Sequence, residues 1–225
     1  MSANWCFALW SGSINKNMAL TYLPLPHIPH PPISYMSWAL KHQHKIYPDA
    51  LEGGGSLEDS ADLDYINRLV VKDGKSYKSR RQRRFPLADE FTQWCKENID
   101  LECFNGSICT NEGNEPFHGP HIDPYRNYGL LYVVDTGGPT VTTSWWQKKD
   151  SPIMYSLEDY PPLLYHDYTD LELLNSASMK VGMWYVINVR VLHSVENLKS
   201  RRITIQCSLN DVSRLESAVL LKNNT

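Results

Sequence analysis

The sequence lacks any apolar run that approaches the roughly 20 residues needed to cross a bilayer, and its 225 residues carry a formal net charge of only −3. So small a charge provides no global field that would favour nucleic acid or anionic lipid as a partner. Residues 1–17 contain the apolar stretch WCFALW, but neither a basic leader nor an obvious cleavage site, so no signal peptide is predicted. We therefore expect a cytoplasmic protein with no membrane partner.

Cysteine is also scarce. The five cysteines form no CxxC pair and occur at Cys6, Cys95, Cys103, Cys109 and Cys207. An odd number without that spacing favours reduced thiols over a disulfide framework or a structural zinc site. The G-x-S-x-G motif of serine hydrolases is absent as well, so that class of enzyme is not supported.

The first hundred residues show few signs of regular strands. Residues 18–35 are dense in proline, residues 50–62 have the composition of a loop, and residues 35–47 would suit a short helix. Residues 72–84 form a basic run that we interpret as a solvated loop, with a clamp for an acidic or phosphate-bearing substrate as the alternative. A helix with Pro86 in its first turn is predicted, because apolar residues recur on one helical face at Leu87, Phe91, Trp94 and Cys95.

The pattern changes after residue 100. Short apolar or alternating runs follow, broken by Gly, Pro, Asn and Asp: YGLLYVV, GGPTVTTSWW, GMWYVINVRVLHSV and RRITIQCSL. Such spacing is typical of an all-β sandwich or barrel. We predict one domain over residues 1–225, mainly β with flanking helices, in which an irregular and helical part (1–100) packs on a β core (101–215).

A candidate metal site lies in this β core. His121 and Asp123 precede the run YGLLYVV, and residues two apart on a strand point to the same side. His193, near the end of another apolar run, is the candidate third ligand. Two imidazoles and one carboxylate on one side of a metal leave its other side open, as in the non-haem Fe(II) oxygenases. A closed four-ligand zinc site would leave no such opening.

A second element is the strand-like segment SRRITIQCSL. Arg202 and Thr204 share one face of such a strand, whereas Ile203 and Ile205 share the other. An arginine inside a barrel is costly unless it meets an anion. A dicarboxylate would supply that anion, and a guanidinium binds a carboxylate with two parallel hydrogen bonds.

The order His121-x-Asp123, His193, Arg202-x-Thr204 resembles the 2-oxoglutarate/Fe(II)-dependent oxygenases over residues 115–210, and the GGPT between the ligands is similar to a motif of small prolyl-hydroxylase-like members. The resemblance implies a double-stranded β-helix, the cupin-like jelly roll. It also implies Fe(II), 2-oxoglutarate and O2 as reactants, with succinate and CO2 as products. Under it, His121, Asp123 and His193 bind the iron, while Arg202 and Thr204 bind 2-oxoglutarate.

The resemblance suggests further site residues. Tyr128 or Tyr132 would donate a phenol to the co-substrate, and alternation puts both on one side of the strand, so the choice stays open. Arg126 would face the substrate, and Trp145, from an adjacent tryptophan pair, would border the site. The nine-residue gap from His193 to Arg202 is slightly short for the family, which keeps the adjacent Arg201 as an alternative to Arg202.

The predicted function is therefore a hydroxylase that acts on a small molecule or a polypeptide, with an amino-acid side chain as the favoured substrate class. The oligomeric state is left open. One rival is a non-catalytic cupin-like barrel that binds a metal or a small ligand, which would have no need of a buried Arg202. The other is an interaction module whose basic run (72–84) contacts nucleic acid in a salt-dependent way.

Overall fold

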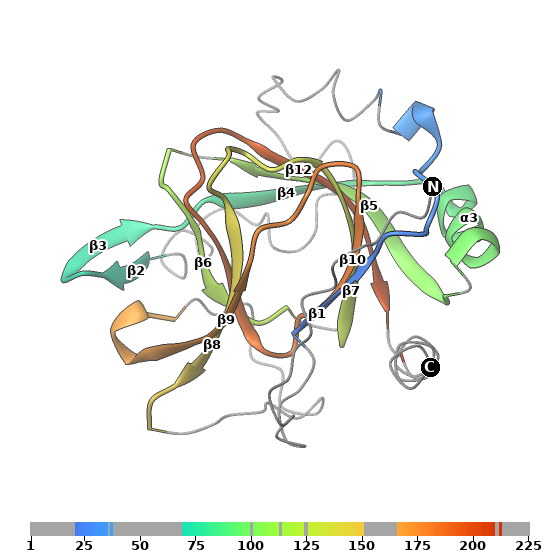
Figure 1. Cartoon of the computed structure of the whole chain (residues 1–225). Helices are drawn as coiled ribbons and strands as arrows, with labels where there is room; N and C mark the ends of the chain where they lie inside the picture. The colour runs from blue at the N-terminus through green and yellow to red at the C-terminus, as the bar shows by residue number, and fades with distance from the viewer. Residues whose placement is uncertain are drawn as a thin grey trace, which may run out of the picture.

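The computed structural model describes residues 21–35, 37, 69–99, 101–112, 114–123, 126–150, 166–209 and 212. Most of these residues belong to two antiparallel sheets that face each other (Figure 1). The larger sheet has the order β1 (Tyr22–Leu25), β10 (Trp184–Asn188), β7 (Tyr128–Asp135), β12 (Arg202–Leu209), β5 (Cys103–Glu112) and β4 (Arg81–Pro86). The smaller sheet has the order β6 (His118–His121), β11 (Leu192–Glu196), β8 (Thr142–Lys148) and β9 (Leu171–Ala177).

The strand order confirms the predicted double-stranded β-helix. Along the chain, β5, β7, β10 and β12 enter the larger sheet, while β6, β8, β9 and β11 enter the smaller one. The chain therefore crosses repeatedly between two four-stranded layers, with the β8–β9 hairpin in the middle, as in a jelly roll. β1 and β4 extend the larger sheet at its two edges.

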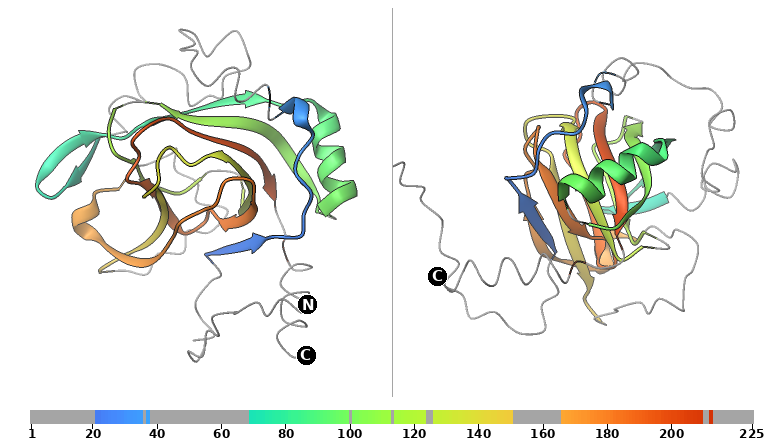
Figure 2. Two further views of the ribbon diagram at one scale, coloured as in Figure 1. Left: turned by 45° about the horizontal axis from the view of Figure 1, so that its top comes forward. Right: turned by 90° about the vertical axis from the view of Figure 1, so that its right-hand side faces the viewer.

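Alternation along the strands gives the larger sheet two apolar faces. Its inner face brings Leu131, Val133 and Tyr185 against Trp145 and Ala177 of the smaller sheet. Its outer face carries Ile203, Ile205, Leu130 and Trp184, which helix α3 (Asp89–Ile99) covers with buried Phe91, Cys95 and Ile99. Figure 2 shows α3 lying across this outer face. A sheet covered on both faces needs apolar residues on both, which explains the continuous apolar run YGLLYVV.

The predicted helix is confirmed, but Pro86 is not in its first turn. Pro86 ends strand β4, and α3 starts at Asp89, so Leu87 packs against the same cluster from outside the helix. Acidic residues in the first turn and Lys96 in the last suit the helix dipole.

The basic run was wrongly interpreted as a loop. It forms the hairpin of β2 (Leu69–Lys72) and β3 (Lys75–Lys78), with a turn at Asp73–Gly74, and then the edge strand β4. The hairpin projects from the barrel beside the short 3-10 helix η3 (Tyr168–Asp170) (Figure 1). Charged side chains suit β4 because an edge strand needs only one pairing partner and a polar outer rim.

Two other expectations, a short helix over 35–47 and a loop over 50–62, fall outside the described residues except at positions 35 and 37. Within the described ranges, no helix is both long and apolar enough to cross a membrane.

Candidate metal centre

The side chains of His121, Asp123 and His193 converge at one end of the barrel. His121 ends β6, and His193 on β11 is its direct partner across the two strands, with ring centroids 4.4 Å apart. Asp123 lies just beyond β6, where its backbone N–H donates to the carbonyl of Val189. The ligand atoms of the three residues all lie within 4.8 Å of one another. The structure thus brings together the three residues that the sequence predicted as candidate ligands.

Hydrogen bonds orient both imidazoles. Nδ1 of His121 lies 2.8 Å from the carbonyl oxygen of Gly119, and Nδ1 of His193 lies 3.0 Å from that of Val191. Because a carbonyl can only accept, Nδ1 is the donor in each of these contacts, and Nε2 is the ring nitrogen that points towards Asp123. The two Nε2 atoms lie 3.5 and 3.9 Å from oxygens of Asp123. Histidine ligands in proteins are commonly oriented in this way.

Arg126 holds the Asp123 carboxylate. Its Nε donates to Oδ2 at 3.0 Å, and its Nη2 donates to the same oxygen. Oδ1 lies 3.5 Å from Nε2 of His121 and 4.0 Å from a guanidinium nitrogen of Arg84. Oδ2 is therefore fixed by Arg126 and also lies nearest His193, whereas Oδ1 is directed towards His121. Arg126 contacts a candidate ligand instead of simply facing a substrate.

The protonation states suit metal binding. Burial, with His121 close by, lowers the pKa of His193 to about 3, so its imidazole is neutral at physiological pH. Burial alone would raise the pKa of Asp123, but Arg126 and the two histidines bring it well below its usual range. A neutral imidazole and an ionised carboxylate are the forms that bind a metal ion.

Arg202 lies inside the barrel, as the strand alternation predicted. It is buried at the start of β12 and reaches across to the smaller sheet, where Nη1 donates to Oγ1 of Thr143 at 3.1 Å and Nη2 lies 3.3 Å from the thioether sulfur of Met179. Among the described residues, no carboxylate lies within ion-pair distance of its guanidinium. Arg201 precedes the strand and is only partly buried.

A second buried arginine, Arg80, has more hydrogen-bond acceptors around its guanidinium than Arg202. Arg80 donates to three backbone carbonyls, those of Glu115, Leu198 and Ser200, so its charge is solvated by the fold itself. Within the described ranges, the guanidinium of Arg202 donates only to a hydroxyl and to a thioether, which is a weak acceptor. A charge buried with so little compensation is unfavourable unless an anion joins it.

Two further donors are unsatisfied on the same face. Asn111 pairs directly with Arg202 across β5 and β12, and its buried Nδ2 has no hydrogen-bond partner among the described residues. Nε2 of Gln206 is likewise buried with no partner in the described part of the chain, while Oε1 of Gln206 lies 3.5 Å from a guanidinium nitrogen of Arg126. Thr204 lies between Arg202 and Gln206 along the strand and is buried. Orphaned donors beside a cation match a ligand rich in oxygen acceptors.

The structure does not support Tyr128 or Tyr132 as ligands of a co-substrate. Both face the outer apolar cluster, opposite to Arg202, and the Tyr132 hydroxyl is hydrogen-bonded to Nδ1 of His30 at 2.7 Å. β7 is buried on both faces, so its sequence gives no polar signal of which residues point inwards. A tyrosine that does face inwards on the neighbouring strand β10 is Tyr185, whose pKa is raised by burial, an effect that the hydrogen bond from the Lys180 N–H and the charge of Arg202 oppose. Sequence reasoning missed this residue.

Trp145 is fully buried in the inner core. It pairs with His193 across β8 and β11, stacks on Tyr22 with ring centroids 5.4 Å apart, and donates from Nε1 to the carbonyl of Asn188. The adjacent Trp146 points to the other side, where its Nε1 donates to Ser194. Trp145 therefore supports the wall beside His193.

His118 is a neighbour of the candidate ligands. It starts β6 and is buried, with its ring centroid 4.5 Å from that of His121. A register shift between β6 and β11 explains how two residues three apart come together. Nδ1 of His118 donates to the carbonyl of Arg80, and the residue is not part of the converging group.

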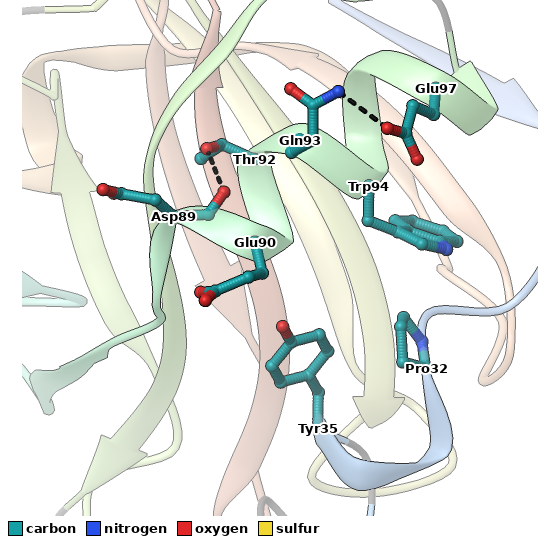
Figure 3. A pocket seen from close by; sticks show the side chains of 8 residues that line it. All are labelled: Pro32, Tyr35, Asp89, Glu90, Thr92, Gln93, Trp94 and Glu97. Carbon is teal, nitrogen blue, oxygen red and sulfur yellow. Dashed lines mark hydrogen bonds between the residues drawn. The ribbon is translucent and has the colours of Figure 1, made fainter.

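A groove of about 710 Å³ lies elsewhere, against α3 (Figure 3). Acidic Asp89, Glu90 and Glu97 line it together with aromatic Tyr35 and Trp94. Since α3 covers the outer face of the larger sheet, this groove is on the opposite side of that sheet from Arg202. It takes no part in the candidate metal centre.

Comparisons with known proteins give matches by structure alone. No protein-family model matches the sequence, and no curated protein matches it. Among solved structures, a Pseudomonas putida prolyl-4-hydroxylase matches with 9% identity and a TM-score of 0.41 over 85% of this chain and 94% of that one. A Trichoplax adhaerens prolyl hydroxylase, in complex with a hypoxia inducible factor peptide fragment, matches with 11% identity and a TM-score of 0.40 over 88% and 86%. Escherichia coli ycfD matches with 14% identity and a TM-score of 0.42 over 88% and 52%. Similarity at this level does not assign the chain to a family.

Proposed function

We propose that this protein is an Fe(II)- and 2-oxoglutarate-dependent dioxygenase. The observation that carries the proposal is the convergence of two imidazoles and one carboxylate at one end of a jelly roll, with Arg202 buried inside the same barrel and no carboxylate partner for it among the described residues. When bound, iron with 2-oxoglutarate and O2 would supply the oxidation of a substrate C–H bond, with succinate and CO2 as products.

The residues of the chain prepare the site for that chemistry. The Nε2 atoms of His121 and His193 and the Asp123 carboxylate would hold the metal, and Arg126 keeps that carboxylate in place. Three protein ligands leave coordination positions open, which a closed structural site would not.

The inner face of β12 would hold the co-substrate. Arg202 would bind its distal carboxylate, while Thr204, Asn111 and Gln206 line the same face, the last two with donors that lack partners. The apolar inner residues, such as Leu131, Val133 and Trp145, would exclude water from the site.

Turnover of 2-oxoglutarate to succinate by the full chain with Fe(II) tests the proposal, and free amino acids and short peptides would be screened for stimulation. Asp123→Ala and His121→Ala should abolish turnover while leaving the circular dichroism spectrum unchanged. His118→Gln is the matched control, because it alters a buried histidine next to His121 that is outside the ligand group. Turnover that persists in Asp123→Ala would refute the ligand assignment. Metal binding without any consumption of 2-oxoglutarate would favour a cupin-like binding protein instead.

The internal contacts of the basic run do not favour the nucleic-acid alternative. Nζ of Lys72 donates to Glu196 at 2.8 Å and lies over the rings of Phe117 and Tyr168. Arg80 is buried on backbone carbonyls. These two cations therefore stabilise the fold and are not displayed for phosphates.

A further inference from the structure

Three cysteines meet on the outer side of the larger sheet. Cys95 comes from α3, Cys103 from the start of β5 and Cys207 from β12, and their sulfur atoms all lie within 4.8 Å of one another. Cys95 and Cys207 have no exposed surface, whereas Cys103 is partly exposed. All three belong to the cluster under α3, so the sheet separates them from Arg202 and the inner face.

The backbone is shaped to bring Cys103 into this group. Cys103 and Ile108 both pack in the outer cluster, although residues an odd number apart on a regular strand face opposite sides. A bulge in β5 removes the conflict: Gln206 pairs with Ser107 while Ser208 pairs with Phe104, and Asn105 between them has φ 54°.

The helix is also brought close to the strand. A Cβ atom at Gly106 would lie 2.7 Å from Cδ1 of Phe91, so only glycine allows α3 to approach β5 at this distance. The position of Cys95 relative to Cys103 therefore depends on a glycine and a bulge in adjacent residues.

We propose that Cys95, Cys103 and Cys207 bind one soft metal ion, Cu(I) or Zn(II), at a site distinct from the His–Asp–His group. Three thiolates suit such ions, whereas imidazole and carboxylate ligands suit Fe(II), so the two sites differ in the metal that they select. Within the described ranges, no further His, Cys, Asp or Glu joins the three cysteines. Cu(I) is satisfied by three sulfurs, and Zn(II) would take a solvent molecule on the side where Cys103 is exposed.

A disulfide explains the arrangement less well. It would join two of the three sulfurs and leave the third thiol buried or half-buried without a role, whereas one ion contacts all three. The bound ion would link α3 to β5 and β12, and so stabilise the outer support of the sheet that carries Arg202 and Thr204.

The test uses the full chain, reduced and anaerobic, with His121→Ala and His193→Ala to remove the other site. Co(II) is the spectroscopic probe for Zn(II), because thiolate ligands give an intense near-ultraviolet charge-transfer band, and affinities for Zn(II) and Cu(I) are measured by competition with chromophoric chelators. We expect one equivalent of ion per chain, with at least tenfold weaker binding in Cys103→Ser. Cys109→Ser is the matched control, because Cys109 is buried but outside the group, and it should bind as tightly as its parent.

A second measurement, the rate of cysteine alkylation, uses the unaltered chain and so does not require that any variant folds. The ion should slow alkylation of Cys103, the most accessible of the three thiols, by at least tenfold, as mass spectrometry of the unaltered chain would show. Absence of the thiolate band, equal affinity in Cys103→Ser, or alkylation that Zn(II) and Cu(I) both leave unchanged would overturn the proposal. So would a disulfide among these cysteines that persists in the reduced, anaerobic protein.

Discussion

Replacing Arg202 by methionine should stabilise the ligand-free protein and at the same time remove most of its affinity for 2-oxoglutarate. The two effects have one cause. In the ligand-free protein the buried guanidinium has no anion beside it among the described residues, and in our proposal the carboxylate of 2-oxoglutarate supplies that anion. Methionine keeps much of the length and volume of the side chain without the charge.

The gain in stability follows from the cost of burying the charge. Burial lowers the pKa of Arg202 from 12.5 to about 10, and each tenfold change in proton affinity corresponds to about 1.4 kcal/mol. The protonated side chain therefore costs the ligand-free folded protein about 3 kcal/mol at neutral pH. Loss of the hydrogen bond to Thr143 cancels roughly 1 to 2 kcal/mol of the stability gained by removing the charge. We therefore expect the free energy of unfolding to rise by about 1 to 2 kcal/mol in Arg202→Met.

The loss of affinity follows from removing one partner of a buried charge pair, which typically costs about 2 kcal/mol or more. That corresponds to a dissociation constant for 2-oxoglutarate raised about 30-fold or more. Urea denaturation measures the stability, and calorimetry with Fe(II)-loaded protein under anaerobic conditions measures the binding.

Arg201→Met is the matched control, because it removes the same charge from the adjacent, partly exposed residue. The affinity of Arg201→Met for 2-oxoglutarate should stay within about twofold of that of the unaltered protein. This change is far smaller than the loss expected when one partner of a buried charge pair is removed. A destabilised Arg202→Met protein with unchanged affinity would refute the reasoning, and a large loss of affinity in Arg201→Met would transfer the role to that residue.

Two further predictions concern the metal centre. Arg126→Ala should weaken Fe(II) binding about 10- to 100-fold, as loss of a group that orients a ligand typically does, with turnover recovering as iron is added; unchanged affinity would show that the contact with Asp123 is incidental. His193 stays neutral in the folded, metal-free protein down to about pH 3, whereas in the unfolded chain it is protonated near pH 6.5. Its contribution to stability is therefore present above pH 6.5 and is lost as the pH falls towards 3, which amounts to roughly 2 kcal/mol at pH 5. Urea denaturation at pH 7.5 and 5.0 should show this loss in the unaltered protein and a smaller one in His193→Asn, and equal losses would contradict the assignment.

The ligand group and the orientation of Arg202 could be predicted because both depend on local periodicity. His121 and Asp123 are two apart beside a strand, and Arg202 alternates with isoleucines that need the apolar face. The direct pairing of His193 with His121 follows from the order in which the strands enter the smaller sheet.

Other features could not be predicted because they depend on partners distant in the sequence. Strand β4 has no apolar alternation, and it is a strand because the edge of β5 offers it backbone partners. Tyr132 and Tyr185 lie on strands buried on both faces, where hydrophobicity does not indicate direction. The cysteines are 8 and 104 residues apart along the chain, and a bulge in β5 decides whether Cys103 faces the other two.

Anaerobic titration of the full chain with Fe(II) and 2-oxoglutarate tests most directly whether the three side chains hold an iron to which the co-substrate binds. We predict a visible charge-transfer band that requires both reactants, saturates at one iron per chain and is absent in Asp123→Ala. A folded protein that gives no such band, or an equal band in Asp123→Ala, would contradict the proposed function.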